Sequence, residues 1–326
     1  MDRRRFIKLG TAAVAATAVS GTSVINASEN LSSRRKDIKA GAPASGYSSE
    51  TGKPSGKDLL VRFLGTGAAD WNGVDERGEH RRLSSVLLDE RILIDFTPTD
   101  SDMLPRGFSR PDAVFYTHSH DDHYNPDAAA SILKAGKIYV GDTWLDRAKS
   151  ELTAAAEKAG RKAPSVTGLA IGQKVNVGDI AVTALPGNHA TGYADEQTLI
   201  YLIEKGDVRV LYATDTGGIP VRAARIVGID AHISSGKPIS GLIMEATMGI
   251  DYDEDYRIFT HSSVGTVKRT ADVLLSTNRL VAPAGQPVYL THMARTLHGT
   301  QAEMDRQLPE PLRAAFDGLE VIFRPA

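Results

Sequence analysis

The stretch FYTHSHDDHYNP (residues 115–126) places three histidines and two aspartates within six consecutive positions. It continues an apolar run, DAVFYT, that predicts a buried strand. Three interpretations compete: a metal site, a solvated charged loop, and a histidine-bearing turn without chemistry. In an extended loop, His118 and His120 can point the same way. Asp122 and His123 lie past the bend, free to serve a second ion nearby.

Other titratable residues occupy similar places along the chain. His189 follows IAVTALPGN, Asp215 follows RVLYAT, and His292 follows PVYLT. Side chains at the C-terminal ends of neighbouring strands converge on one rim of a sheet, so ligands far apart in sequence can meet there. Scattered core histidines would show no such placement. The pattern therefore favours the metal site.

The composition limits the chemistry. The chain has 326 residues, 41% of them hydrophobic and 24% charged, which is ordinary for a soluble globular protein. A formal net charge of −2 gives no reason to expect a nucleic-acid or acidic-membrane partner. There is no cysteine, which excludes a disulfide framework, a cysteine nucleophile and a thiolate metal site. Any metal must be held by His, Asp or Glu.

The N-terminus reads as an export signal. DRRRFIKLG (residues 2–10) precedes a mildly apolar stretch, and together they resemble the twin-arginine consensus. Ile25 and Ala27 fit the −3 and −1 positions of a signal-peptidase site. The stretch is too short and too weakly hydrophobic for a stable membrane span. We expect residues 1–27 to be a twin-arginine signal peptide, the export machinery to be a partner, and the mature protein to be periplasmic or secreted.

The rest of the chain divides at residue 58. Residues 28–57 are rich in Ser, Gly, Ala, Pro and Lys, which predicts a flexible linker. Strands and helices then interleave, which predicts one domain, 58–326, of the α/β (α+β) class with helices outside sheets. Strands are expected over residues 59–65, 84–96 (a hairpin), 112–117, 137–141, 173–185, 198–213, 241–246, 286–291 and 319–323; helices are expected over 127–136, 143–160 and 262–276, with a further polar helical region before the last strand.

The motif H-x-H-x-D-H, followed by a lone His, an Asp and a late His after separate strands, resembles the metallo-β-lactamase superfamily. The resemblance runs from Leu59 to Phe323. It implies a four-layer αββα sandwich, with two mixed sheets and helices outside. It also implies two divalent ions, Zn²⁺ first, with Mn²⁺ or Fe²⁺ as alternatives. One ion would take His118, His120 and His189, the other Asp122, His123 and His292, with Asp215 bridging both.

Two ions with a bridging carboxylate imply hydrolysis. They lower the pKa of a shared water and stabilise the developing oxyanion. Oxygen or redox chemistry at two irons, as in flavodiiron relatives, is an alternative. That branch usually swaps in another carboxylate ligand and carries a flavin domain, for which this chain has no room.

Two further motifs resemble the phosphodiesterase branch of the superfamily, which includes RNase Z and cyclic phosphodiesterases. Glu245 lies in LIMEATMG and His261 in FTHSSVG. In that branch the matching His contacts the scissile phosphate and the matching Glu orients it. The predicted catalytic residues are therefore His261, Glu245 and Asp122. Alternatively, His261 only hydrogen-bonds near a helix start, where Ser262 could cap the helix.

The chain also departs from that branch. It lacks the cysteine-rich zinc site of the cyclic phosphodiesterases. Only 25 residues separate His189 from Asp215, with no basic insertion to grip transfer RNA. We therefore expect a small phosphodiester substrate, cyclic ones included, and no nucleic acid.

Several alternatives stay open. A hydrolase of lactones, esters or β-lactam-like amides would use the same metals without His261. A non-catalytic binding protein is disfavoured because no ligand is missing. A homodimer is left open. His80, His232 and His298 lie in polar sequence and are left out of the predicted site.

Overall fold

A computed structural model describes residues 55–230, 236–281 and 285–325. The predicted signal peptide, 1–27, and the predicted linker up to residue 54 lie outside these ranges. The first strand begins at Leu59, close to the predicted start of the domain. None of the helices in the described ranges combines the length and the apolar composition that crossing a membrane requires.

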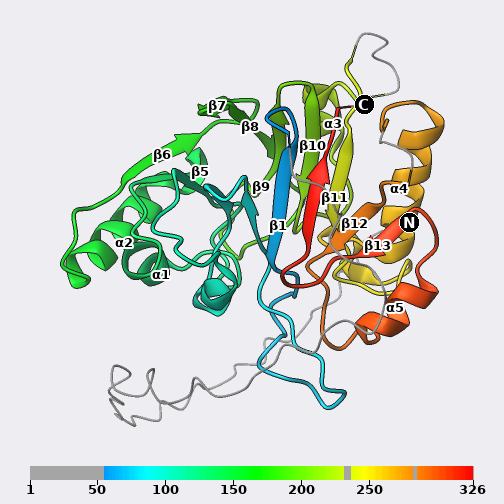
Figure 1. Cartoon of the computed structure of the whole chain (residues 1–326), viewed down its shortest axis with the longest axis horizontal. Helices are drawn as coiled ribbons and strands as arrows, with labels where there is room; N and C mark the ends of the chain where they lie inside the picture. The colour runs from blue at the N-terminus through cyan, green and yellow to red at the C-terminus, as the bar shows by residue number, and fades with distance from the viewer. Residues whose placement is uncertain (1–54, 231–235, 282–284, 326) are drawn as a thin grey trace, which may run out of the picture. The chain divides into compact units, whose positions relative to one another are not determined.

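Two mixed sheets of seven strands each form the centre of the domain (Figure 1). The first has the order β14 (Glu320–Phe323), β1 (Leu59–Gly65), β2 (Ser85–Leu88), β3 (Ile92–Ile94), β4 (Ala113–Phe115), β5 (Lys137–Gly141) and β6 (Ser165–Leu169). The second has the order β13 (Leu312–Ala314), β12 (Val288–Thr291), β11 (Gly241–Glu245), β10 (Val208–Ala213), β9 (Leu199–Lys205), β8 (Ile180–Pro186) and β7 (Lys174–Val177).

Helices cover the outer face of each sheet (Figure 1). The first sheet carries α1 (Pro126–Ser131) and α2 (Leu145–Lys158). The second carries α3 (Val221–Val227), α4 (Val264–Ser276) and α5 (Gln301–Gln307). Three short 3₁₀ helices complete the described part, η1 (Pro98–Met103), η2 (Asp142–Trp144) and η3 (Tyr256–Phe259).

The layers follow from the alternation of side chains along each strand. In β4, Phe115 points into the core between the sheets, whereas Val114 packs with α1 and α2. In β10, Tyr212 lies in the same central core, whereas Leu211 packs with α4. Apart from Arg209 in β10, both strands are apolar on both faces, as is typical of buried strands. The predicted four-layer sandwich is confirmed.

Some elements differ from the predictions. β6 and β13 were not expected: β6 is polar and largely exposed, and β13 has only three residues, so neither carries an apolar run. α3 is a further unpredicted element, seven residues long. The predicted capping role of Ser262 is wrong, because Ser263 caps α4 and accepts from the Thr266 amide.

The directions of six strands place the loops that follow them on the same side of the domain. β10, β11 and β12 run parallel, and β8 shares their direction because both β8 and β10 are antiparallel to β9. In the first sheet, β3 and β4 are parallel neighbours. The residues that follow these strands include every predicted metal ligand.

Candidate metal centre

The HSHDDH segment turns sharply after β4. The His123 amide donates to the His120 carbonyl at 3.0 Å, and the Tyr124 amide donates to the same oxygen at 2.8 Å. Ahead of the turn, the Thr117 amide donates to Asp95 Oδ1 at 2.8 Å. The turn separates His118 and His120 from the residues after it, as the sequence predicted.

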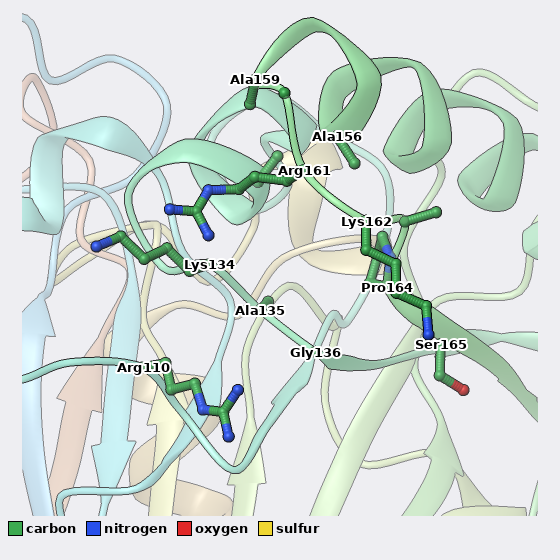
Figure 2. A pocket seen from close by; sticks show the side chains of 13 residues that line it. Arg110, Lys134, Ala135, Gly136, Ala156, Ala159, Arg161, Lys162, Pro164 and Ser165 are labelled. Carbon is green, nitrogen blue, oxygen red and sulfur yellow. The ribbon is translucent and has the colours of Figure 1, made fainter.

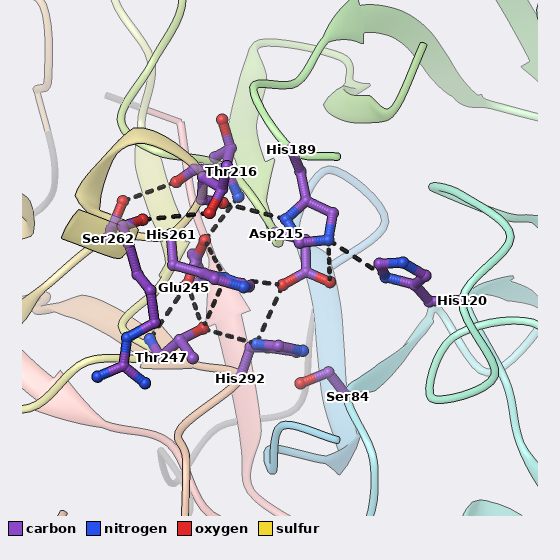
Figure 3. A network of polar contacts seen from close by, with 12 residues as sticks. Ser84, His120, His189, Asp215, Thr216, Glu245, Thr247, His261, Ser262 and His292 are labelled. Carbon is purple, nitrogen blue, oxygen red and sulfur yellow. Dashed lines mark hydrogen bonds and ion pairs between the residues drawn. The ribbon is translucent and has the colours of Figure 1, made fainter. Parts of the chain in front are cut away.

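The first group of candidate ligands contains His118, His120, His189 and Asp215, whose ligand atoms all lie within 4.8 Å of one another. His120 Nδ1 lies 3.0 Å from His118 Nε2 and 3.2 Å from His189 Nε2. His118 Nε2 lies 3.2 Å from Asp215 Oδ2. Figure 3 shows His120, His189 and Asp215 facing one another.

The second group contains Asp122, His123, Asp215 and His292, within the same limit. His123 Nε2 lies 2.9 Å from Asp215 Oδ2 and 3.4 Å from Asp122 Oδ2. His292 Nε2 lies 3.2 Å from Asp122 Oδ2. All four residues are buried. The structure thus places the seven predicted ligands in the two predicted groups, with Asp215 shared.

The hydrogen bonds outside the two groups indicate which ring nitrogen carries the proton. His118 Nδ1 faces Thr117 Oγ1 at 3.0 Å, and that hydroxyl donates to Asp95. His123 Nδ1 faces Asp95 Oδ2 at 2.7 Å, and His189 Nδ1 faces the Thr260 carbonyl at 3.1 Å. An Nδ1 that donates outward leaves the Nε2 lone pair of these three rings directed inward and available to a metal ion, whereas His120 presents Nδ1 to the first group.

None of these partners was predicted as a site residue, and neither was Thr247. Thr247 Oγ1 donates to Glu245 and lies 2.8 Å from His292 Nδ1. Asp95 follows the apolar strand ILI, which is the same strand-end signal that marked the ligands. That signal could have identified Asp95, whereas the sequence gives no comparable mark for Thr247.

Three residues at strand ends adopt a left-handed backbone: Asp95 (φ 57°), Asp215 (φ 43°) and His292 (φ 51°). Non-glycine residues hold this conformation at an energetic cost of about 1 kcal/mol or more. All three turn their side chains toward the two groups. The strain is concentrated where the chain must aim a ligand or its partner.

His261 and Glu245 adjoin both groups (Figure 3). His261 Nδ1 lies 3.3 Å from Glu245 Oε1 and 3.4 Å from Asp215 Oδ1. Burial lowers the pKa of His261, but Glu245 and Asp215 outweigh it and raise that pKa to about 10. Glu245 is fully buried and also accepts from the Thr216 amide at 2.6 Å.

The electrostatics favour cations. Four buried carboxylates, Asp95, Asp122, Asp215 and Glu245, share this region. Burial opposes ionisation of Asp122 and Asp215, yet the neighbouring histidines hold the pKa of both carboxyls well below the usual value. Burying negative charge without a compensating cation is costly.

The donor set fits two divalent ions. His118 Nε2 and His189 Nε2 lie 3.0 Å and 3.2 Å from His120 Nδ1, an arrangement that favours a cation between their lone pairs. His123 Nε2 and Asp215 Oδ1 are buried without a hydrogen bond. Imidazole nitrogen and carboxylate oxygen are ligands for Zn²⁺, Mn²⁺ or Fe²⁺.

The histidines left out of the predicted site lie apart from the two groups. His298 is partly buried, and its Nε2 lies 2.6 Å from the Ala246 carbonyl. His80 is exposed and contacts the Gly73 carbonyl. His232 lies outside the described residues.

A basic cavity of about 880 Å³ lies away from this centre, lined by Arg110, Lys134, Arg161 and Lys162 together with small residues (Figure 2). Lys134 follows the end of α1, and Arg161 and Lys162 follow the end of α2. Positive charge is favourable beside the C-terminal end of a helix. The cavity contains none of the predicted site residues.

Comparison with known proteins supports the fold. A model of the β-lactamase superfamily domain matches residues 90–275. No curated protein matches the sequence.

Solved structures are similar at low sequence identity. The metallo-β-lactamase fold protein YhfI from Bacillus subtilis is 17% identical, with a TM-score of 0.57 over 81% of this chain and 99% of its own. Zn²⁺-bound PqqB from Methylobacterium extorquens is 16% identical, with a TM-score of 0.57 over 80% of this chain and 99% of its own. The short form of human tRNase Z is 16% identical, with a TM-score of 0.55 over 81% of this chain and 99% of its own. At these identities the likeness concerns the fold alone.

Proposed function

Because the chain belongs to the metallo-β-lactamase superfamily, whose members are generally metal-dependent hydrolases, we propose that it is a phosphodiesterase acting on small phosphodiesters. In this proposal His118, His120 and His189 hold one divalent ion, Asp122, His123 and His292 hold the other, and Asp215, common to the two groups, serves both. Zn²⁺ is the first choice for this set of nitrogen and oxygen donors. When bound, such a pair of ions supplies hydroxide near neutral pH and neutralises charge on the phosphoryl oxygens.

The placement of His261 carries the choice of substrate class. Its Nδ1 faces Glu245 and Asp215, which keeps a proton on that nitrogen. Its Nε2 has no partner among the described residues, and 18% of the side chain is exposed. The imidazole is therefore oriented by carboxylates on one side and open to a substrate on the other.

A phosphodiester is the substrate that most needs such a group. Negative charge gathers on its non-bridging oxygens in the transition state, and an alkoxide leaving group must gain a proton. An imidazolium beside the reacting phosphate can stabilise the negative charge on these oxygens and can give the leaving group its proton. A lactone or β-lactam also expels a group that needs a proton, but its carbonyl is neutral, whereas a phosphodiester is already anionic and gains most from a cationic imidazolium beside it. Glu245 is buried behind His261 and acts as a positioning residue.

The test compares His261→Ala with the wild type on several substrates. We expect both ions to remain bound, while turnover of alkyl phosphodiesters falls roughly 10²–10⁴-fold, the usual scale for a general acid or an oxyanion contact. The loss should shrink for bis-p-nitrophenyl phosphate, whose leaving group needs little protonation. His80→Ala, at an exposed histidine away from the centre, is the control. Full activity of His261→Ala on alkyl phosphodiesters, or wild-type lactone cleavage far above phosphodiester cleavage, would overturn the proposal.

A further inference from the structure

Two aromatic side chains of the segment that leads to His261 lie in solvent. Tyr256 is 82% exposed and Phe259 is 72% exposed, the highest values among the large hydrophobic residues described. Both belong to η3, which ends two residues before His261. Large exposed apolar groups at one place on a surface often mark a binding site.

The backbone that carries these rings is held against the centre. The Phe259 carbonyl accepts from Asn188 Nδ2 at 2.7 Å, next to His189. The His261 amide donates to the Arg257 carbonyl at 2.8 Å. η3 is therefore joined to the segments that carry His189 and His261, and the backbone that carries the two rings has a defined position relative to both.

A glycine allows this close approach. A Cβ on Gly217 would lie 2.5 Å from the Phe259 carbonyl carbon and 2.6 Å from the Ile258 carbonyl oxygen, closer than real contacts allow. Gly217 is two residues from Asp215, so η3 also packs directly on the segment of the shared carboxylate.

Charged side chains at the start of η3 pair within the segment. Asp255 caps η3 by accepting from the Arg257 amide at 2.9 Å and also pairs with the Arg257 guanidinium at 2.8 Å. The guanidinium lies 5.9 Å from the Tyr256 ring centre. These contacts order the segment but leave most of both rings in water.

The geometry points to a substrate-binding lip formed by Tyr256 and Phe259, which takes an apolar, preferably aromatic, group attached to the phosphodiester. The inference rests on the proposed function and names its substrate class. Ligand sites typically combine apolar or aromatic walls with a few polar groups, here those around His261. Aromatic ligand groups add ring–ring contacts to the burial of apolar area. Two rings are too few for a stable protein interface, which buries about 800 Å² on each partner.

Binding of uncleavable anions tests the lip without turnover. Diphenylphosphinate and dimethylphosphinate carry the same charge and cannot be hydrolysed, but only the first offers aromatic groups. By calorimetry on the metal-loaded protein, we expect diphenylphosphinate to bind at least about 10-fold more tightly, from the apolar area that its rings bury. The double variant Tyr256→Ser/Phe259→Ser should lose most of this preference and leave dimethylphosphinate binding unchanged.

Turnover gives a second readout. The double variant should raise KM for bis-p-nitrophenyl phosphate by roughly 10-fold with kcat nearly unchanged, because the lip binds the ground state and the transition state alike. Val273→Ser is the control, since it removes an exposed apolar side chain on α4 outside η3. All variants are checked for metal content and thermal unfolding.

The outcomes separate this inference from the proposed function. Suppose that the wild type cleaves phosphodiesters and that the double variant still prefers diphenylphosphinate to dimethylphosphinate as strongly as the wild type does. That result would overturn the inference of the lip. A preference that the variant removes, in a protein that cleaves no phosphodiester, would support the lip and overturn the phosphodiesterase proposal.

Discussion

Five imidazole rings surround the Asp215 carboxylate. Its oxygens lie 3.2 Å from His118, 2.9 Å from His123, 3.2 Å from His292, 3.4 Å from His261 and 4.0 Å from His189. The predicted bridging role needs a carboxylate that ions in both groups can reach. The Asp215 carboxylate belongs to both groups and meets this need. The sequence marked it because it follows an apolar strand.

Some residues of the site have no sequence pattern that would identify them. Thr247 contacts Glu245, His261 and His292 through a single hydroxyl. A threonine after a strand is common, and only the folded chain shows that three site residues converge on it. Contacts of this kind depend on packing between segments that are remote in sequence.

Asp95→Asn should weaken metal binding. Asp95 accepts from His123 and from Thr117, whose hydroxyl in turn faces His118, so one carboxylate orients a ligand of each group. Loss of such an outer partner typically costs about 10–100-fold in metal affinity. Competition with a chelator measures this affinity for wild type and variant.

Asp112→Asn is the matched control for that experiment. Asp112 precedes β4, and its exposed carboxylate pairs with Arg91. Its replacement should leave metal affinity unchanged. Equal affinity in Asp95→Asn and the wild type would show that Asp95 does not orient the ligands.

At the scale of elements, apolar runs predicted most of the strands, because a strand buried on both faces has a local signature. The edge strand β6 lacks it, since its exposed polar residues match a loop equally well. The cap of α4 was misplaced by one residue for a different reason. Ser262 is engaged by the Thr216 carbonyl and the Gly218 amide, contacts that the local sequence does not reveal.

The segment after β12 should lose stability in acid through His298. Burial lowers the pKa of His298 to about 4, against an ordinary value of 6.5. Because the folded pKa is the lower one, the unfolded chain binds the proton first as the pH falls. Stability is full above pH 6.5 and declines toward pH 4. His298 is only partly buried, so we expect the decline to be about 1–2 kcal/mol.

The measurement compares unfolding by urea at pH 7.5 and pH 5.0 in wild type and His298→Asn. The variant should be less stable at pH 7.5, through its altered bond to the Ala246 carbonyl, but should lose less on acidification. His80→Asn is the control and should keep the wild-type difference. An unchanged pH dependence in His298→Asn would contradict the assignment.

At the scale of the whole molecule, the centre draws on both sheets. The first supplies Asp95 and the HSHDDH segment, and the second supplies His189, Asp215, Glu245 and His292. Neither sheet alone holds a complete group. The apolar core between the sheets therefore sets the distances between ligands from different sheets. The spacing of the ligands along the sequence does not predict these distances.

We further propose that the protein is exported through the twin-arginine route, on the basis of the N-terminal sequence. Replacing Arg3 and Arg4 together with lysines should leave the precursor in the cytoplasm, because the lysine pair lacks the arginines of the consensus. Fractionation of cells that express each form measures this. If the mature form of the double variant is found outside the cytoplasm at the wild-type level, the proposed route is contradicted.

Metal content shows directly whether the two four-residue groups that share Asp215 hold two ions. The purified full-length protein is reconstituted with Zn²⁺, freed of loosely bound metal, and analysed for metal per chain. Two ions per chain is the predicted result. One ion, or none, would contradict the account.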